Sequence, residues 1–564
     1  MNDIRRTILW VIFGFSMVLL WDKWQIHNGH QATFFPSAAA PAATSPAPAA
    51  PVGQAGASSV PTASGNGAAA TPGSTLPPTL ASAPSQRTEV RTDVFRLVFD
   101  SAGGTLVQGE LLLHTDFEHH DEKFTLLDES PNRVYVAQSG LIGGDFPTHK
   151  TPMTLLPGPL SLADGDSTLA VRFESGDVGG VKLRKTYTLT RGSYAIDVKQ
   201  EVINDGSTPV SPQLYLQLVR DGNKPPGESS FYSTFTGPAV YTEAKKYQKV
   251  DFKKIEENKV DIEKQATNGY VAMVQHYFAT AWVLPDGIQR DLFMRKVDSN
   301  LYAVGMITPI GTLAPGASKT IDATFYAGPQ EEKKLEALSP GLELVKDYGW
   351  LTILAKPLYW LLDKLHGFIG NWGWSIVALV LLLKAAFYWL NAKAYSSMAK
   401  MKAINPKIMA MRERLKDKPQ EMQKEMMRIY REEKVNPMGG CFPIVIQIPF
   451  FISLYWVLLS SVEMRGAPWI MWIHDLSAPD PFFILPLLMT LTSLLQTALN
   501  PAPPDPMQAK LMWIMPLAFS VMFFFFPSGL VLYWITNNIL SIAQQWIINT
   551  RMGVPPQFNL PKFK

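Results

Sequence analysis

The sequence is poor in cysteine, and its charges almost cancel. Its 564 residues contain one cysteine, Cys441, which excludes an internal disulfide and a zinc site built from cysteines. The net charge of +3 excludes a strongly basic nucleic-acid binder, so we expect no sequence-specific nucleic-acid partner. No phosphate-binding glycine loop, His-Glu-x-x-His pair or nucleophile elbow is present. We therefore expect neither an enzyme nor a cofactor.

Tryptophan is nearly absent from the middle of the chain. Only Trp282 lies between residues 25 and 349, and the other tryptophans lie at 10–24 or 350–546. Tryptophan is enriched at membrane–water interfaces, where its apolar ring and its single N–H are both satisfied. The distribution therefore predicts a water-soluble block with membrane segments at both ends.

The N-terminal segment is an apolar run between charges. Residues 7–21 carry no charge, and they follow two arginines. A cleaved signal peptide and a retained anchor both fit this pattern. Because Asp22 and Lys23 come before any small-residue cleavage site, we favour an uncleaved anchor over 1–24. The two preceding arginines predict a cytoplasmic N-terminus.

A long stretch without charge follows this anchor. Residues 36–86 contain no charged side chain and consist mainly of Ala, Pro, Ser, Gly and Thr. Such a composition cannot bury a core, so 25–87 is predicted to be a disordered linker outside the cytoplasm. A plain tether is the favoured interpretation, with a binding role as the alternative.

Residues 88–339 have the pattern of β structure. Short alternating runs at 94–99, 181–189 and 194–202 are separated by glycine-containing turns. This predicts a sandwich-type domain. The next segment, 340–371, is amphipathic and reads as a helix lying in the membrane interface. A core helix of the soluble domain is the alternative for that segment.

The C-terminal part contains apolar runs of about the length that a bilayer crossing requires, roughly 20 residues. We predict five spans, which gives six with the anchor: 372–390, 442–461, 482–498, 511–526 and 530–548. The predicted cytoplasmic segments are a helical hairpin at 391–441, a loop at 499–510 and a tail at 549–564. On the opposite side of the membrane we predict a loop at 462–481 and a turn at 527–529.

The distribution of charge predicts the orientation. Residues 391–441 carry twelve Lys and Arg against six Asp and Glu, a net charge of +6. Positive loops stay in the cytoplasm, so both termini are predicted to be cytoplasmic and the β domain to lie on the other side. The eight methionines of this hairpin suit a surface for varied apolar partners, and the alternative is that they pack the two helices together.

Lys384 is the one charged residue within the predicted span 372–390. A charge inside a span is costly unless it faces water or a partner, which makes Lys384 a functional candidate. The alternative is a lysine whose stem reaches toward the interface. Gln447 lies in another span, and Asn538, Ser541 and Gln545 share one face of the last span. These polar groups predict either a wet cavity around Lys384 or hydrogen bonds between helices.

Three motifs resemble the YidC-type membrane protein insertases in their Gram-negative form, which carries a large periplasmic domain. The motifs are NPMGGCFP at 436–443, WIHDLS at 472–477 and FPSGLVLY at 526–533. The resemblance runs from about 370 to 548, and the layout of the whole chain matches. It implies a multi-pass protein of the bacterial inner membrane, with a helical bundle and a periplasmic β-supersandwich of the sugar-mutarotase type.

The resemblance also implies a function and its partners. Such proteins insert nascent membrane proteins into the bilayer and help them fold, alone or with the Sec translocon and its accessory subunits. They need no cofactor and act in contact with membrane lipids. Their five spans enclose a hydrophilic groove with a basic residue, which is Arg in enterobacteria and matches Lys384 here.

The resemblance assigns further residues to these roles. Gln447 and Ser541 match polar groove positions, while Tyr533 and Trp534 match the side of the last span that contacts substrate. The cytoplasmic hairpin receives substrate and approaches the ribosome, and Tyr388 and Tyr395 match positions near that contact. Lysine keeps the charge of the usual arginine but lacks its two-pronged geometry, which leaves attraction intact and a fixed carboxylate geometry in doubt.

Two other functions remain as alternatives. The first is a solute transporter that binds an anion at Lys384, although the chain has no internal repeats and few spans. The second is a periplasmic carbohydrate enzyme for which the spans are only an anchor, although five additional spans exceed what anchorage requires.

Overall fold

The computed structural model describes residues 59–62, 85–117, 119, 121–225, 234–415, 418–433, 442–500, 506–553 and 558. The predicted anchor, 1–24, lies outside the described residues, as does most of the predicted linker. The chain divides into two compact units: Ala39–Lys346, and Met1–Ala38 with Asp347–Lys564. We call the first the β unit and the second the helical unit.

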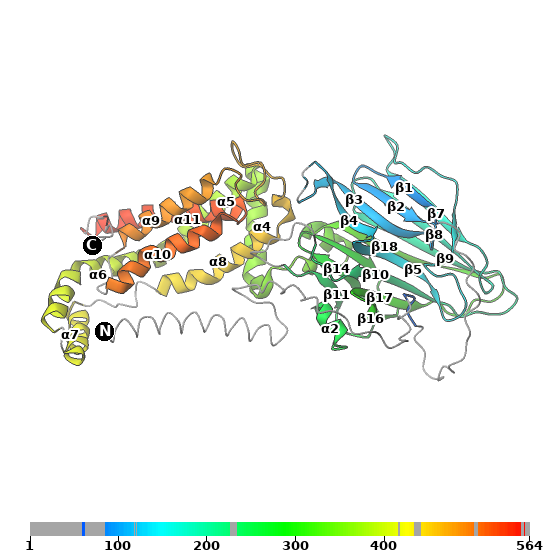
Figure 1. The fold of residues 1–564 in the computed structure, drawn as a ribbon, viewed down its shortest axis with the longest axis horizontal. Helices are drawn as coiled ribbons and strands as arrows, with labels where there is room; N and C mark the ends of the chain where they lie inside the picture. The colour runs from blue at the N-terminus through cyan, green and yellow to red at the C-terminus, as the bar shows by residue number, and fades with distance from the viewer. Residues whose placement is uncertain are drawn as a thin grey trace, which may run out of the picture. The chain divides into compact units, whose positions relative to one another are not determined.

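The β unit contains two antiparallel sheets of nine strands each (Figure 1). The first sheet has the order β1 (Arg87–Arg91), β2 (Phe95–Asp100), β3 (Thr105–Thr115), β4 (Lys123–Ser130), β5 (Arg133–Ile142), β10 (Gln213–Asp221), β17 (Leu301–Pro309), β16 (Arg290–Asp298) and β13 (Gln265–Ala266). The second has the order β12 (Lys246–Lys249), β11 (Gly237–Thr242), β14 (Tyr270–Gln275), β15 (Phe278–Val283), β18 (Ser318–Pro329), β9 (Ala195–Asn204), β8 (Val181–Thr190), β7 (Thr168–Ser175) and β6 (Met153–Leu155).

The hairpin of β8 and β9 follows from the alternation in the sequence. Buried and partly exposed residues alternate along β8, which places its apolar side chains on one face. The strands pair antiparallel from Val181 opposite Asn204 to Leu189 opposite Ile196. Gly192 in the connecting turn has φ +73°, a conformation that glycine adopts without steric cost. The predicted β pair is therefore confirmed.

Buried side chains join the two sheets across their inner faces. Trp282 of β15 is 1% exposed, and its Nε1 donates to the carbonyl of Gln217 on β10 at 3.2 Å. The Tyr135 hydroxyl of β5 donates to the carbonyl of Met273 on β14 at 3.0 Å. The core thus lies between the sheets, and its polar tips are paired, as burial requires. Short helices α2 (Phe252–Glu256), α3 (Glu332–Leu338) and η1 (Leu342–Val345) complete the unit.

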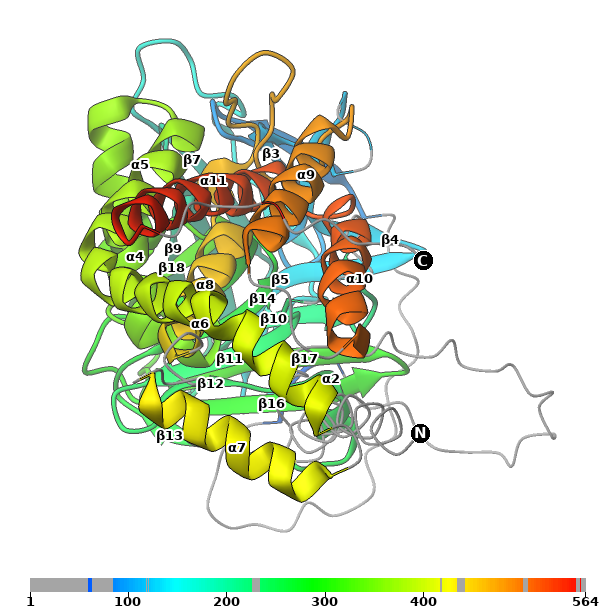
Figure 2. The ribbon, with the colours of Figure 1, turned by 90° about the vertical axis from the view of Figure 1, so that its left-hand side faces the viewer.

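Figure 2 shows the helical unit from another direction, with α6 and α7 toward the viewer. Its elements are η2 (Gly349–Leu351), α4 (Thr352–Ile369), α5 (Trp372–Ala386), α6 (Tyr388–Arg414), α7 (Pro419–Glu432), α8 (Phe442–Ser460), η3 (Val462–Met464), α9 (Ile484–Leu499), α10 (Pro506–Phe523) and α11 (Ser528–Arg551). Prolines lie inside four of these helices, α4, α6, α8 and α10.

Helix α4 occupies most of the amphipathic segment that was predicted over 340–371. It buries Leu358 and Leu362 and exposes Trp360 and Phe368. Its neighbours are α5 and α8, and it belongs to the helical unit. Helix α4 therefore lies outside the β unit, and its position in the membrane interface stays a prediction.

The second predicted span is not one straight helix. Helix α5 ends at Ala386 and α6 begins at Tyr388, with a bend of 68° between them. Within the described residues, no single helix is long and apolar enough to cross a bilayer, and this bent pair passes only as a pair. Shorter apolar helices cover Ile446–Ser460, Ile484–Leu499 and Ala509–Phe523.

Helices α6 and α7 form a hairpin through an apolar seam (Figures 1 and 2). Ile404, Ile408 and Met411 of α6 are buried, and Met422 and Met426 of α7 are among the residues that pack against them. Pro419 occupies the first turn of α7, where its missing N–H costs nothing. Some of the hairpin methionines therefore pack the two helices together.

Candidate functional site

Lys384 lies in the last turn of α5 and is 8% exposed. Its Nζ donates a hydrogen bond to Oγ of Ser541 on α11, at 2.7 Å. The Ser541 hydroxyl in turn donates to the carbonyl of Asn537 at 2.7 Å, which leaves an oxygen lone pair directed at the lysine. No acidic side chain among the described residues forms an ion pair with Lys384. The ammonium group is therefore held by neutral oxygen, and its charge is not neutralised by a neighbour.

Three amide side chains form a chain of hydrogen bonds beside this pair. Nε2 of Gln447 on α8 donates to Oδ1 of Asn391 on α6 at 2.6 Å. Nδ2 of Asn391 donates to Oε1 of Gln544 on α11 at 3.3 Å. Nε2 of Gln544 then donates to the backbone carbonyl of Lys384, also at 3.3 Å. Four helices thus converge on one polar cluster, and each amide is paired within it.

Asn391 was missed by the sequence reasoning. It is 5% exposed and links α8 to α11, yet it falls just beyond the predicted end of a span, where a polar residue is ordinary. Lys384 and Asn391 lie on opposite sides of the 68° bend between α5 and α6, so the spacing along a straight helix gave no signal that would place the two together.

A small cavity adjoins the cluster. Its volume is about 30 Å³, roughly that of one water molecule. The lining combines charged, polar and aromatic groups from three helices, α5, α8 and α11, with Phe387 at the bend before α6: Val380, Leu383, Lys384, Phe387, Gln447, Phe450, Phe451, Tyr533 and Asn537. Three of the predicted groove residues therefore line one space, and Ser541 reaches it through its bond to Lys384.

The predicted substrate side of α11 is an aromatic wall. Tyr533 is 5% exposed, and its ring centroid lies 5.6 Å from that of Phe451 on α8. Trp534 stacks on the same Phe451 at 5.3 Å and meets the edge of Phe523 on α10. Trp534 does not line the cavity of Lys384. Both residues thus connect α11 to α8 through the ring of Phe451, and Trp534 also connects α11 to α10.

The other polar residues of α11 belong to a different contact. Nδ2 of Asn538 donates to hydroxyls of Thr492 and Ser493 on α9 at 3.2 and 2.9 Å. Gln545 Nε2 donates to Oδ1 of Asn500, just beyond the end of α9, at 3.1 Å. The predicted shared face therefore divides: Ser541 bonds Lys384, while Asn538 and Gln545 make the interhelical bonds of the alternative interpretation.

Two of the sequence motifs meet at the start of α11. Gly529 N donates to the carbonyl of Leu476 at 2.9 Å, and Ser528 bonds the carbonyl of Ala478 through both its N–H and its hydroxyl. Asp480 closes the same loop, since its carboxylate accepts from Trp472 Nε1. The loop that contains WIHDLS therefore packs against the first turn of α11, which FPSGLVLY begins.

The tyrosines assigned to a ribosome contact lie along the first two turns of α6. Tyr388 is 41% exposed, whereas Tyr395 is partly buried. Trp389, between them in sequence, is 67% exposed, and Lys393 Nζ lies 3.6 Å from its ring centroid. The start of α6 therefore carries an accessible aromatic and basic surface.

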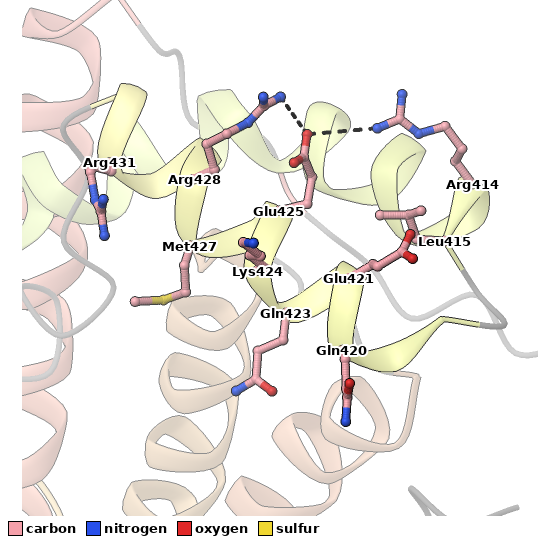
Figure 3. A pocket seen from close by; sticks show the side chains of 10 residues that line it. All are labelled: Arg414, Leu415, Gln420, Glu421, Gln423, Lys424, Glu425, Met427, Arg428 and Arg431. Atoms are coloured by element: carbon pink, nitrogen blue, oxygen red, sulfur yellow. Dashed lines mark hydrogen bonds and ion pairs between the residues drawn. The ribbon is translucent and has the colours of Figure 1, made fainter.

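The hairpin carries a second hollow, with a volume of about 1010 Å³, between the end of α6 and α7 (Figure 3). Arg428 and Arg414 approach Glu425 at 2.6 and 3.8 Å. Lys424 and Arg431 also line it. The hollow is exposed, and its lining has a net positive charge, with four basic side chains against the two acidic ones of Glu421 and Glu425. No cluster of His, Cys, Asp and Glu suited to a metal ion is found in the described part of the chain.

Comparisons with known proteins give one consistent result. Residues 87–361 match the family described as "YidC periplasmic domain", and 364–554 match "60Kd inner membrane protein". The chain is 56% identical over 554 residues to "Membrane protein insertase YidC" of Cupriavidus necator, covering 98% of each chain. It is 54% identical over 559 residues to the protein of the same name from Ralstonia nicotianae, again covering 98% of each.

A solved structure also resembles the chain. It is described as an active YidC insertase crystal structure with the first transmembrane domain resolved. The identity is 19% and the TM-score 0.38, over 82% of this chain and 94% of that one.

Proposed function

This chain belongs to the YidC family of membrane protein insertases, and we propose that it inserts nascent proteins into the bacterial inner membrane. Its relatives carry the insertase name over nearly the full length of both chains. Membership of this family implies an inner-membrane protein with a periplasmic domain. The family is named for insertion and not for an enzymatic reaction, and the role that we propose is non-enzymatic.

The observation that carries the mechanism is Lys384, buried among four helices with a neutral partner. Its charge is held by Ser541 Oγ at 2.7 Å, and its cavity has room for about one water. We propose that this cavity is the closed form of a hydrophilic groove for the translocated tail of a substrate. A polar lining lowers the cost of bringing such a tail into a low-dielectric slab.

Tyr533 and Trp534 suit the next step of insertion, which is the movement of the hydrophobic segment into lipid. Their rings form an apolar wall with Phe451, within reach of the polar cluster. We propose that the hydrophobic segment of the substrate slides along this wall while its tail passes Lys384. Once that segment reaches lipid, burial of its apolar surface supplies the driving force, so the insertase itself requires no cofactor.

The exposed surface of the helical unit supports its placement in a membrane. Helices α9 and α10 expose large apolar side chains, a pattern that water-soluble proteins rarely show in one region. These include Leu487, Leu488, Leu491, Ile514, Leu517, Phe519 and Val521. We propose the anchor 1–24 and five spans, 372–390, 442–461, 482–498, 511–526 and 530–548. Both termini and the 391–441 hairpin would then be cytoplasmic, and 25–339 periplasmic.

The hairpin is the proposed receiving surface. Its basic hollow and the aromatic start of α6, with Tyr388 and Tyr395, suit contact with a ribosome and with an emerging chain. Cooperation with the Sec translocon and its accessory subunits, assistance to folding and contact with lipids complete the proposal, which rests there on the family resemblance.

The test is insertion by the purified full-length chain in proteoliposomes. The substrate is a small single-span protein, and its translocated tail is scored by protection from external protease. We expect protection that depends on the chain and is absent from empty liposomes. A chain that conducts small anions but inserts no substrate would refute the proposal and favour the transporter.

A truncation separates the proposal from the carbohydrate-enzyme alternative. Deletion of much of 90–330, with 1–24 and 340–564 retained, removes both sheets. We expect insertion to continue, because the polar cluster lies wholly in the helical unit. Loss of all activity with a correctly embedded helical unit would favour the alternative.

A further inference from the structure

Four residues of the predicted linker, Ser59 to Thr62, are seated on the β unit. The carbonyl oxygen of Ser59 accepts hydrogen bonds from Nε2 of Gln217 at 3.0 Å and from Nη2 of Arg295 at 2.7 Å. The Ser59 hydroxyl lies 3.1 Å from Nε2 of His149. These contacts join the linker to residues up to 236 positions away in sequence.

The contacts lie on the face of the first sheet that points away from the second. Ser139 of β5 faces the second sheet, because its hydroxyl accepts from Gln200 of β9. Ser139 pairs with Leu216 of β10, so the side chains of the flanking Tyr215 and Gln217 point to the opposite face. We call this outer surface of β5, β10, β17 and β16 the linker-contact face.

The linker-contact face offers an apolar floor to the residue after Ser59. Ile142, Tyr215 and Ile307 form a buried cluster, and Val60 packs against it together with Phe293. Pro61 is buried and Thr62 is exposed. The segment therefore presents a carbonyl and a hydroxyl to polar side chains and two apolar side chains to the sheet.

The polar groups that receive Ser59 are positioned by their own neighbours. Nδ1 of His149 lies 2.6 Å from the Tyr215 hydroxyl, which also accepts from the backbone N–H of His149. This leaves Nε2 of the ring free to meet Ser59. The Arg295 guanidinium lies over the ring of Phe293 at 5.9 Å. Gln217 is fully buried and His149 is 6% exposed, so their hydrogen bonds to Ser59 are largely shielded from water. Buried polar groups need such partners.

We propose that the linker-contact face is a docking site for the chain's own segment Ser59 to Thr62. The segment suits such a site because it has no charge to desolvate and its proline is restricted before binding. Covalent attachment supplies an effective concentration in the millimolar range, so four residues suffice where a free peptide of that size would not bind. The linker is then held at one fixed point, with 24 residues between Thr62 and Arg87, the start of β1.

The test measures the reactivity of single cysteines in the full-length chain in nanodiscs. Cys441, the only native cysteine, is replaced by serine, and either Val60 or Thr62 is replaced by cysteine. We expect a water-soluble thiol reagent to label Val60→Cys about tenfold more slowly than Thr62→Cys, as local opening against ~1.4 kcal/mol would give. Equal rates at the two positions would overturn the proposal.

A second substitution tests the polar contacts. Arg295→Ala removes one donor to the Ser59 carbonyl, and we expect it to raise the labelling rate of Val60→Cys about fivefold, the equivalent of one ordinary hydrogen bond. The matched control is Arg184→Ala on the second sheet, which is ion-paired with Glu174 and Glu201 and should leave the rate unchanged. An unchanged rate in Arg295→Ala would contradict the proposal.

Cross-linking keeps the proposal testable if Arg295→Ala fails to fold. A short bifunctional thiol reagent should join Val60→Cys to Ile307→Cys within one chain, since Val60 packs against Ile307 in the cluster. Absence of this cross-link in the folded chain would refute the docking. A single-cysteine variant Ile307→Cys that labels slowly, while Val60→Cys labels fast, would mean that something other than Ser59 to Thr62 covers the linker-contact face. That result would also overturn the proposal.

Discussion

Replacement of Lys384 should impair insertion according to the charge of the substrate tail. Lys384→Met removes the ammonium group but keeps an unbranched apolar stem of similar length. Lys384→Glu reverses the charge, and Lys384→Arg retains it. Since Lys384 is bonded to the neutral Ser541 hydroxyl and forms no ion pair with the described residues, its charge is available to an incoming carboxylate.

The expected magnitude follows from the surroundings of the lysine. A carboxylate about 4 Å from the ammonium gains about 4 kcal/mol at an effective dielectric constant near 20. Desolvation of both groups opposes that gain, and hydrogen bonds to charged groups contribute about 1.5–3 kcal/mol net. At ~1.4 kcal/mol for each factor of ten, Lys384→Met should slow insertion of an acidic tail by roughly 10- to 100-fold.

Two substrates that differ only in their tails provide the assay. One carries aspartates in the translocated tail and the other carries asparagines at the same positions. Initial rates of protease protection are compared in proteoliposomes with equal amounts of each variant. Lys384→Met should slow the aspartate tail selectively, Lys384→Glu should slow it further, and Lys384→Arg should insert it at nearly the original rate.

A second lysine provides the matched control. Lys364 on α4 is exposed, so Lys364→Met loses the same charge without touching the polar cluster and should insert both substrates normally. The charge argument fails if Lys384→Glu inserts the aspartate tail as fast as the parent chain. It also fails if Lys384→Met slows both tails equally, because the lysine would then act only through packing.

Three further predictions concern stability and the hairpin. Burial lowers the pKa of Lys185 in β8 from 10.5 to about 7, so between these values the unfolded chain holds a proton that the native chain lacks. The free energy of unfolding of the β unit should therefore rise with pH across this window by up to ~1.4 kcal/mol per unit, and Lys185→Met should flatten this rise in urea unfolding followed by circular dichroism. Asp480 is 1% exposed, and its carboxylate accepts hydrogen bonds from Trp472 Nε1 and from the backbone N–H groups of Phe482 and Leu485. Asp480→Ala should therefore destabilise the helical unit by about 3 kcal/mol, and Asp480→Asn by less. Both effects would be measured as a lower Tm in detergent. Deletion of 399–434 should impair insertion while the polar cluster stays folded, and normal insertion by that variant would remove the receiving role of the hairpin.

Local signals in the sequence predicted the elements that depend on local chemistry. The alternation in β8 and β9 and the glycine between them were sufficient for that hairpin. Pro419 marked the start of α7. The bend after Ala386 could not be predicted in this way, because neither proline nor glycine occurs between residues 375 and 390.

The candidate site was predictable only in part, because helical spacing gives a face but not the helix that packs against it. Ser541 and Asn538 are close on α11, yet one bonds α5 and the other α9. The docked segment was hidden for a related reason. Ser59 and Val60 resemble the rest of the linker, and their partners come from distant strands such as those of Gln217 and Arg295.

The prolines inside α4, α6, α8 and α10 have a mechanical consequence. A proline has no amide hydrogen, so each of these helices has one point at which bending breaks no backbone hydrogen bond. Pro449 of α8 lies two residues beyond Gln447, and Pro516 lies near the middle of α10. We infer that α8 and α10, which contact Trp534 from two sides, can bend at these prolines. Such bending would let the bundle accommodate polypeptides of different width while the helical hydrogen bonds on either side of each proline stay intact.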